Sequence, residues 1–167
     1  VDENTPLDVG QGFTMKGSGS AASEHNYTFI GRPNNGNITA PLSSGNYQAL
    51  VGNPYPSALD GNDFITDNSG VLETGALNFW EHAPSNNSHV LSQYEGGYAV
   101  YNLSGGLPAA SPPSEFGGLG NANKIPGRYV PIAQGFFVTG NAAGGNIIFQ
   151  NSQRIFRKES ASSVFLR

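Results

Sequence analysis

The chain has 167 residues, of which 37% are hydrophobic and only 12% are charged, and it contains no cysteine. The absence of cysteine excludes disulfides, thiolate metal sites and cysteine nucleophiles. A net charge of −4 without a basic stripe argues against nucleic acid as a partner, and no apolar run approaches the roughly 20 residues of a transmembrane helix.

Chain breakers divide the sequence into many short segments. The 23 glycines and 11 prolines are spread along the chain and separate short aromatic and β-branched runs, which is typical of strands joined by turns. In chain order, strands are predicted at residues 12–16, 26–31, 36–41, 47–52, 76–82, 97–102, 129–131, 135–139, 146–149 and 164–167. Very little helix is expected, with short turns near residues 58–65 and 85–95, and residues 105–123 are predicted to form a long surface loop.

These elements predict an all-β fold, a two-sheet antiparallel β-sandwich of the jelly-roll type, with residues 1–167 as a single domain. Central apolar positions of the strand-like runs are the expected core. The predicted core residues are Phe13, Phe29, Leu50, Val51, Trp80, Val100, Phe137 and Ile148.

Several phrases in this order resemble a known extracellular segment. They are QGF at residues 11–13, FIGRPNNG at 29–36, LVGNPYPSALD at 50–60, NFWEH at 78–82, GGYAVYN at 96–102, YVPIAQGFFV at 129–138 and FQNSQRIF at 149–156. The chain is similar over nearly its whole length to a β-domain that precedes the type IX secretion C-terminal sorting domain in large secreted and surface proteins of Bacteroidetes, especially Flavobacteria. The resemblance implies secretion to the medium or the outer cell surface, and a chain that is a mature piece of a longer protein. It implies no catalytic residue.

Aromatic residues raise the possibility of a sugar-binding face. Tyr55, in the proline-rich corner at residues 52–57, and Trp80, Tyr98 and Tyr101 are candidate stacking residues, because sugars pack on aromatic rings and hydrogen-bond to amides. The alternative is that these rings fill the core of a sandwich and that the corner is architectural.

An acidic, amide-rich stretch offers oxygen ligands for calcium. Its candidate ligands are Asp60, Asn62, Asp63 and Asp67, although the spacing is not that of an EF-hand. In the alternative interpretation, Asp60 and Asn68 cap turns or a single helical turn. No other cofactor is expected.

No catalytic residue is assigned. Adjacent strand residues such as Glu81 and His82 point to opposite faces, and the common nucleophile, zinc and P-loop motifs are absent. The first functional hypothesis is therefore a non-catalytic surface module for adhesion, self-assembly or spacing, with neighbouring domains of the parent protein or copies of itself as partners. A polysaccharide-binding module is the alternative, and a small secreted hydrolase is the third. The acidic N-terminal segment and the basic segment 152–167 are predicted to pair within or between molecules.

Overall fold

The computed structural model describes residues 6–14, 28, 30–82, 90, 96–110 and 124–158. All strand pairs in this part of the chain are antiparallel. The strands are β1 (Ile38–Leu42), β2 (Gln48–Gly52), β3 (Ala58–Asp60), β4 (Ala76–His82), β5 (Gly96–Asn102), β6 (Gly105–Leu107), β7 (Tyr129–Val130), β8 (Gly135–Thr139), β9 (Gly145–Phe149) and β10 (Arg154–Ile155). The helices are α1 (Gly61–Asp67) and the 3-10 helix η3 (Asn151–Gln153).

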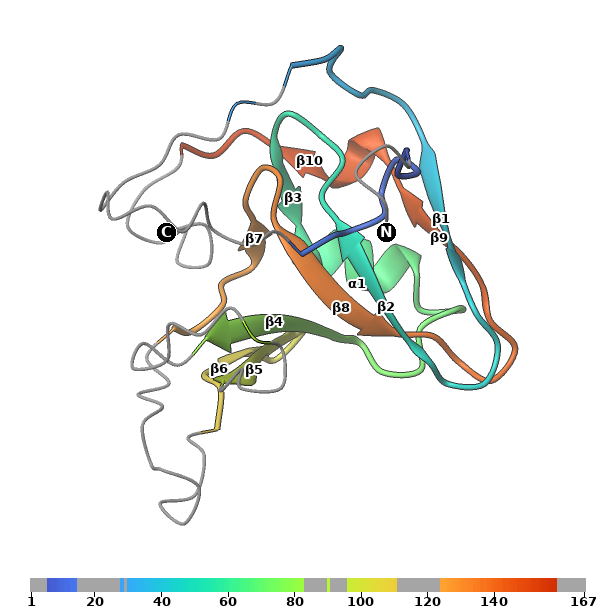
Figure 1. Ribbon diagram of the computed structural model, residues 1–167, viewed down its shortest axis with the longest axis vertical. Coiled ribbons are helices and arrows are strands. Elements are labelled where there is room, and N and C mark those ends of the chain that lie inside the picture. Colours follow the sequence, from blue (N-terminus) through green and yellow to red (C-terminus); the bar gives the residue numbers. More distant parts are fainter. Residues whose placement is uncertain are drawn as a thin grey trace.

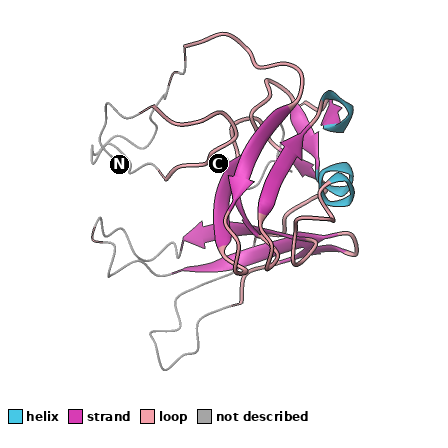
Figure 2. Cartoon of the chain, turned by 90° about the vertical axis from the view of Figure 1, so that its right-hand side faces the viewer, coloured by secondary structure: helices cyan, strands magenta, loops and turns pink. Residues whose placement is uncertain are grey.

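The predicted all-β sandwich is confirmed, with the strands divided among three hydrogen-bonded sheets. The large sheet has the order β2-β8-β4-β5-β6, and two smaller sheets, β10-β3-β7 and β1-β9, pack with it (Figure 1). Low helix content is confirmed for the described residues, where α1 has seven residues and η3 has three. Both helices lie on the same side of the strands (Figure 2). No helix formed by the described residues is long and apolar enough to cross a membrane.

A single hydrophobic core joins the sheets. Phe64 of α1 lies at its centre, with its ring centroid 5.5 Å from that of Phe136 on β8 and 5.1 Å from that of Phe149 on β9. All three side chains are at most 1% exposed. Each buried phenylalanine contributes about 1.5–3 kcal/mol through the surface it removes from water. The short helix α1 therefore packs against both the large sheet and the β1–β9 pair through Phe64.

The predicted core was right for Val51 and wrong for most of the other positions. Phe13, Trp80 and Ile148 are 53%, 40% and 38% exposed. Leu50, Val100 and Phe137 are half-buried on the face of the large sheet that points away from the core, and Phe29 lies outside the described residues. Their immediate neighbours, such as Phe79 and Phe136, are buried instead. Because these strands carry large apolar residues on both faces, alternation alone does not identify the inner face.

Most predicted strands form with shifts of a residue or two. In the region near residues 58–65, where a short turn was predicted, residues 58–60 pair as β3 and the helix α1 begins at Gly61. The predicted loop 105–123 begins with a strand, β6, and residues 111–123 lie outside the description, as do residues 85–89, 91–95 and 164–167. In the predicted strands 12–16 and 26–31, the described residues form no strand, and Ile30 is 96% exposed.

The large sheet twists sharply in its middle. Strands β4 and β8 are paired only at Asn78 and Phe137, whereas β4 pairs with β5 over its full length. Figure 1 shows β2 and β8 crossing the direction of β4 and β5 at a steep angle. This crossing brings side chains from three strands together on the outer face.

Candidate functional site

Three aromatic rings form a row on the outer face of the large sheet. Trp80 of β4 and Tyr98 of β5 are directly paired, with ring centroids 5.1 Å apart and ring planes at 68°. Tyr98 contacts Phe137 of β8 at 5.5 Å and 83°. Trp80 is 40% exposed and Tyr98 39%, so this outer aromatic row (Trp80, Tyr98 and Phe137) is accessible to solvent although its rings support one another.

These rings point away from the core because successive side chains of a strand point to opposite faces and the residues next to them in sequence are buried in the core. On β4, Leu77 and Phe79 are buried in the core, so Asn78 and Trp80 point outward. A glycine also makes room for the indole. A Cβ atom on Gly96 would clash with the carbonyl oxygen of Glu81 and lie 2.7 Å from Cζ2 of Trp80, so a larger residue there would displace the neighbouring backbone as well as the ring.

The other described side chains of the outer face are apolar or polar. Asn78 lies between the rings in the sheet, and its Nδ2 donates a 3.4 Å hydrogen bond to the carbonyl of Phe137. The other side chains that the register places on this face are Gln48, Leu50, Ala76, His82, Val100, Asn102, Leu107 and Thr139. Neither acidic nor lysine or arginine side chains occur among these described positions.

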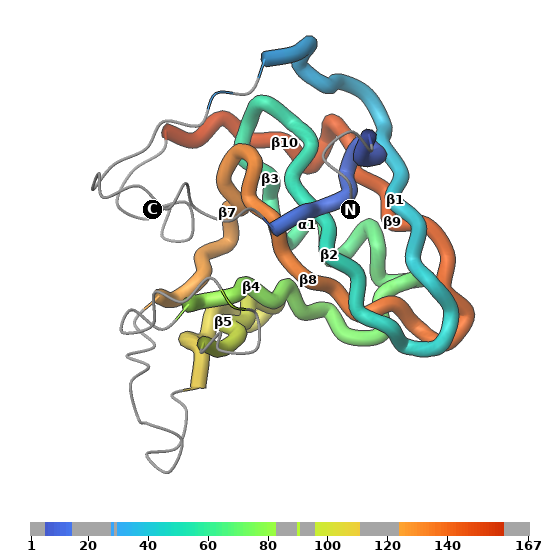
Figure 3. The backbone as a smooth tube through the Cα atoms, viewed as in Figure 1, coloured from blue at the N-terminus to red at the C-terminus, as the bar shows by residue number. Residues whose placement is uncertain are grey.

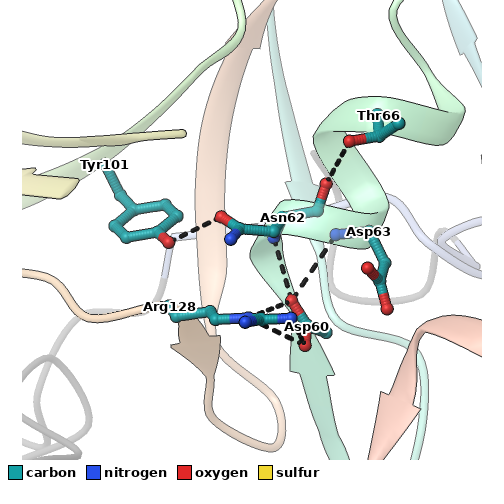
Figure 4. Close-up of polar contacts among 6 residues, drawn as sticks. All are labelled: Asp60, Asn62, Asp63, Thr66, Tyr101 and Arg128. Atoms are coloured by element: carbon teal, nitrogen blue, oxygen red, sulfur yellow. Dashed lines mark hydrogen bonds and ion pairs between the residues drawn. The ribbon is translucent and has the colours of Figure 1, made fainter. Parts of the chain in front are cut away.

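Of the four predicted stacking residues, the structure brings together Trp80 and Tyr98 and buries the other two. Tyr55 is 2% exposed and donates a 2.7 Å hydrogen bond to the carbonyl of Gly36. Tyr101 is 5% exposed and donates a 2.7 Å hydrogen bond to Oδ1 of Asn62 (Figure 4). Of the two interpretations of the proline-rich corner, the structure contradicts an exposed Tyr55 and agrees with an architectural corner.

The acidic stretch forms a helix cap and an ion pair. Oδ1 of Asp60 accepts hydrogen bonds from the amides of Asn62 and Asp63 at the start of α1, as the capping interpretation predicted. The same carboxylate binds Arg128 through two guanidinium nitrogens, with Oδ2 2.8 Å from Nη2 (Figure 4). Asp60 is 4% exposed, so the charge of Arg128 compensates a buried carboxylate.

Three of the four predicted calcium ligands, Asp60, Asn62 and Asp67, use their side-chain oxygens in separate contacts with other residues. Asn62 accepts a hydrogen bond from Tyr101, and Asp63 is exposed. Asp67, at the opposite end of α1, accepts hydrogen bonds from Gln150 and Gln153. In the part of the chain that the structure describes, no group of three His, Cys, Asp or Glu side chains is placed to hold a metal ion. Calcium binding by this stretch stays a prediction.

Asn68 has a role that is partly predictable. It was expected as a cap, and it does end α1, with its amide bonded to the carbonyl of Phe64. Its side chain also pairs with the backbone of Ile148, accepting from the amide at 2.7 Å and donating to the carbonyl at 3.0 Å. A side-chain amide thus occupies the edge of β9 in place of another strand. The sequence carries no signal for this contact, because the partners are 80 residues apart.

Comparison with known protein families finds a match over the whole chain. The family described as Domain of unknown function (DUF8693) matches residues 1–167. No curated protein and no solved structure matches the chain.

Proposed function

The chain belongs to the family described as Domain of unknown function (DUF8693), and we propose for it a function drawn from its outer face: a non-catalytic extracellular module that adheres to polysaccharide. The observation that carries this proposal is the outer aromatic row. Two of the residues that the sequence offers as sugar-stacking candidates, Trp80 and Tyr98, come from different strands and meet on one exposed surface.

The chemistry of the row fits a carbohydrate. Sugar rings present C–H groups that pack on aromatic faces, and the polar tips of tryptophan and tyrosine can bond to hydroxyls at the same time. Asn78 beside the rings and Asn102 and Gln48 toward the margins add amide groups to the same face. Because carboxylate, ammonium and guanidinium groups are missing from the described outer-face positions, a neutral polysaccharide suits this surface better than a charged one.

The ring geometry also favours a particular form of polysaccharide. The ring planes within the row are inclined at 68° and 83° to each other, so they cannot all lie flat on one crystalline surface. A single soluble chain, whose sugar units rotate along its length, can contact such rings in turn. We therefore propose a soluble, single-chain ligand.

A second candidate is a protein partner, such as a neighbouring domain of the parent protein or another copy. It is favoured by Leu107, which is 61% exposed, and by Leu50 and Val100 on the same face. Interface centres are rich in aromatic residues and poor in charge, as this face is. In this role the module is a spacer or a unit of assembly.

The test is binding to soluble xylan, mannan and mixed-linkage glucan, measured by affinity electrophoresis and calorimetry. We expect at least one of these to bind, and Trp80→Ala and Tyr98→Ala each to weaken binding by about tenfold, which corresponds to about 1.4 kcal/mol. Tyr47→Ala is the matched control, because Tyr47 is 65% exposed and precedes β2 outside the row. It is expected to bind like the parent.

The proposal fails if none of the three polysaccharides binds, or if both row variants bind as tightly as the parent. The protein-partner candidate is tested separately by sedimentation of the same proteins. Self-association that Trp80→Ala abolishes would favour a second copy as the occupant of the face.

A further inference from the structure

One row of side chains runs across all five strands of the large sheet on its outer face. In this row the register aligns Leu50 of β2, Phe137 of β8, Asn78 of β4, Val100 of β5 and Leu107 of β6. Four of these side chains are apolar, and the exception, Asn78, lies at the centre. Because its apolar neighbours exclude part of the surrounding water, the amide of Asn78 needs hydrogen-bond partners.

The orientation of the Asn78 amide is set where β8 crosses β4. Figure 3 shows β8 approaching β4 at an angle, and the two strands pair only at Asn78 and Phe137. Nδ2 of Asn78 donates a 3.4 Å hydrogen bond to the carbonyl of Phe137. A carbonyl oxygen can only accept hydrogen bonds, so the amide must turn its NH₂ group toward β8. The Oδ1 atom of Asn78 is therefore directed away from that carbonyl.

This Oδ1 atom is an acceptor that the described residues leave unused, since none of them donates a hydrogen bond to it. In the same part of the chain, the buried side-chain atoms without a partner belong to Glu81 and Gln134, so solvent reaches Oδ1 of Asn78. Asn102, on the same face, differs because its Oδ1 accepts a 2.8 Å hydrogen bond from the amide of Ser104. Of these two asparagines, Asn78 offers its oxygen to a ligand.

The Asn78 amide lies beside the rings of the outer aromatic row. Trp80 follows Asn78 by two residues on the same face of β4, and Tyr98 is paired with Trp80. The rings of Tyr98 and Phe137 come from the strands on either side of β4, and their centroids are 5.5 Å apart. A sugar unit that packs on these rings brings its hydroxyl groups next to the amide oxygen.

We propose that Asn78 selects the ligand of the outer aromatic row, an inference that rests on the proposed polysaccharide binding and deepens it. Oδ1 of Asn78 accepts a hydrogen bond from a free hydroxyl of the sugar unit held by the rings. A sugar unit that is esterified at this hydroxyl has no proton to donate, and it covers the oxygen without giving it a partner. The ligand class is therefore a neutral polysaccharide without O-acetyl groups on the bound units.

The test compares one polysaccharide with and without O-acetyl groups. The probe is whichever of soluble xylan, mannan and mixed-linkage glucan binds the parent most tightly, unmodified and after O-acetylation to a level that keeps it soluble. Calorimetry is expected to show that acetylation weakens binding to the parent by at least about tenfold. Asn78→Leu and Asn78→Ala should each bind the unmodified chain about tenfold more weakly than the parent, and acetylation should weaken their binding by less than about twofold.

The matched control is Asn146→Leu, which removes an exposed amide from β9, outside the large sheet. It should bind and discriminate like the parent, and urea denaturation checks that each variant is folded. Folded Asn78 variants that bind like the parent, while Trp80→Ala and Tyr98→Ala bind more weakly, would overturn this inference and leave the proposed function intact.

Two further results would count against the inference. Acetylation that leaves binding to the parent unchanged would overturn it, as would acetylation that weakens the parent and the Asn78 variants equally, because an equal loss reflects steric exclusion alone. If none of the three polysaccharides binds the parent, the proposed function and this inference fail together.

Discussion

Asn53 connects the proline-rich corner after β2 to the strand that precedes β8. Its Nδ2 group is shared among the carbonyls of Ser57, Val130 and Pro131, at 2.8, 3.3 and 3.0 Å, and its Oδ1 accepts from the amide of Tyr55. The side chain is 6% exposed, so water cannot replace these contacts. The corner is thus architectural, and one buried amide holds it.

Replacing this amide should be costly. We expect Asn53→Ala to lower the free energy of unfolding by about 1–3 kcal/mol, because buried carbonyls lose their donor. The matched control is Asn146→Ala on the exposed side of β9, which should change it by no more than about 0.5 kcal/mol. Urea denaturation of the two variants and the parent measures both changes in the free energy of unfolding. Equal stability of the two variants would contradict the role assigned to Asn53.

Two buried tyrosine side chains make the stability of the domain depend on pH in the alkaline range. Burial raises the pKa of Tyr55 and of Tyr101 above the ordinary value, against the smaller opposing effects of Arg154 and Arg128. The unfolded chain therefore loses these protons first, and the stability that the phenols contribute is present below about pH 10 and is lost as pH rises through the folded-state pKa.

The expected result is a fall in the free energy of unfolding between about pH 9 and pH 11 that is shallower in Tyr101→Phe than in the parent. Urea denaturation at several pH values measures both slopes. Identical slopes would show that Tyr101 does not contribute to this pH dependence.

At the scale of elements, strands were easier to predict than the faces they bury. Breaker spacing located β4 and β8 at their observed bounds, because turns are local and glycine and proline mark them. The inner face depends on which side the other sheets cover, and β8 carries Phe136 and Phe137 in succession. Strands β3 and β10 are too short to show an alternation of apolar and polar residues. They pair with each other although their residues are nearly 100 positions apart in the sequence, so no local pattern predicts this pairing.

Adjacent phenylalanines on β8 test the face assignment directly. Phe136→Ala should lower the free energy of unfolding by about 3–5 kcal/mol, because the ring is 1% exposed and its removal leaves a cavity. Phe137→Ala should cost clearly less, since that ring is half-buried on the outer face. Thermal and urea denaturation of the two variants compare these losses. A larger loss for Phe137→Ala would reverse the inner and outer faces of the large sheet.

At the scale of the whole molecule, the sequence predicted some of the residues of the candidate site but not how they come together. Aromatic composition identified Trp80 and Tyr98 as candidates, but the same reasoning included Tyr55 and Tyr101, whose burial depends on Gly36 and Asn62 from other parts of the chain. Phe137 was assigned to the core, and its place in the outer aromatic row follows only from the crossing of β8 over β4. Secretion and the relation to type IX proteins stay predictions.

The central claim is that the outer aromatic row is the binding surface, and Trp80 reports on it directly because it is the chain's single tryptophan. Its fluorescence should be accessible to acrylamide in the free protein, since the side chain is 40% exposed. Titration with a polysaccharide that binds the chain should shift the emission to shorter wavelength and protect it from acrylamide, and Tyr47→Ala should behave in the same way. Saturable binding that leaves both the emission and the quenching of Trp80 unchanged would contradict the account.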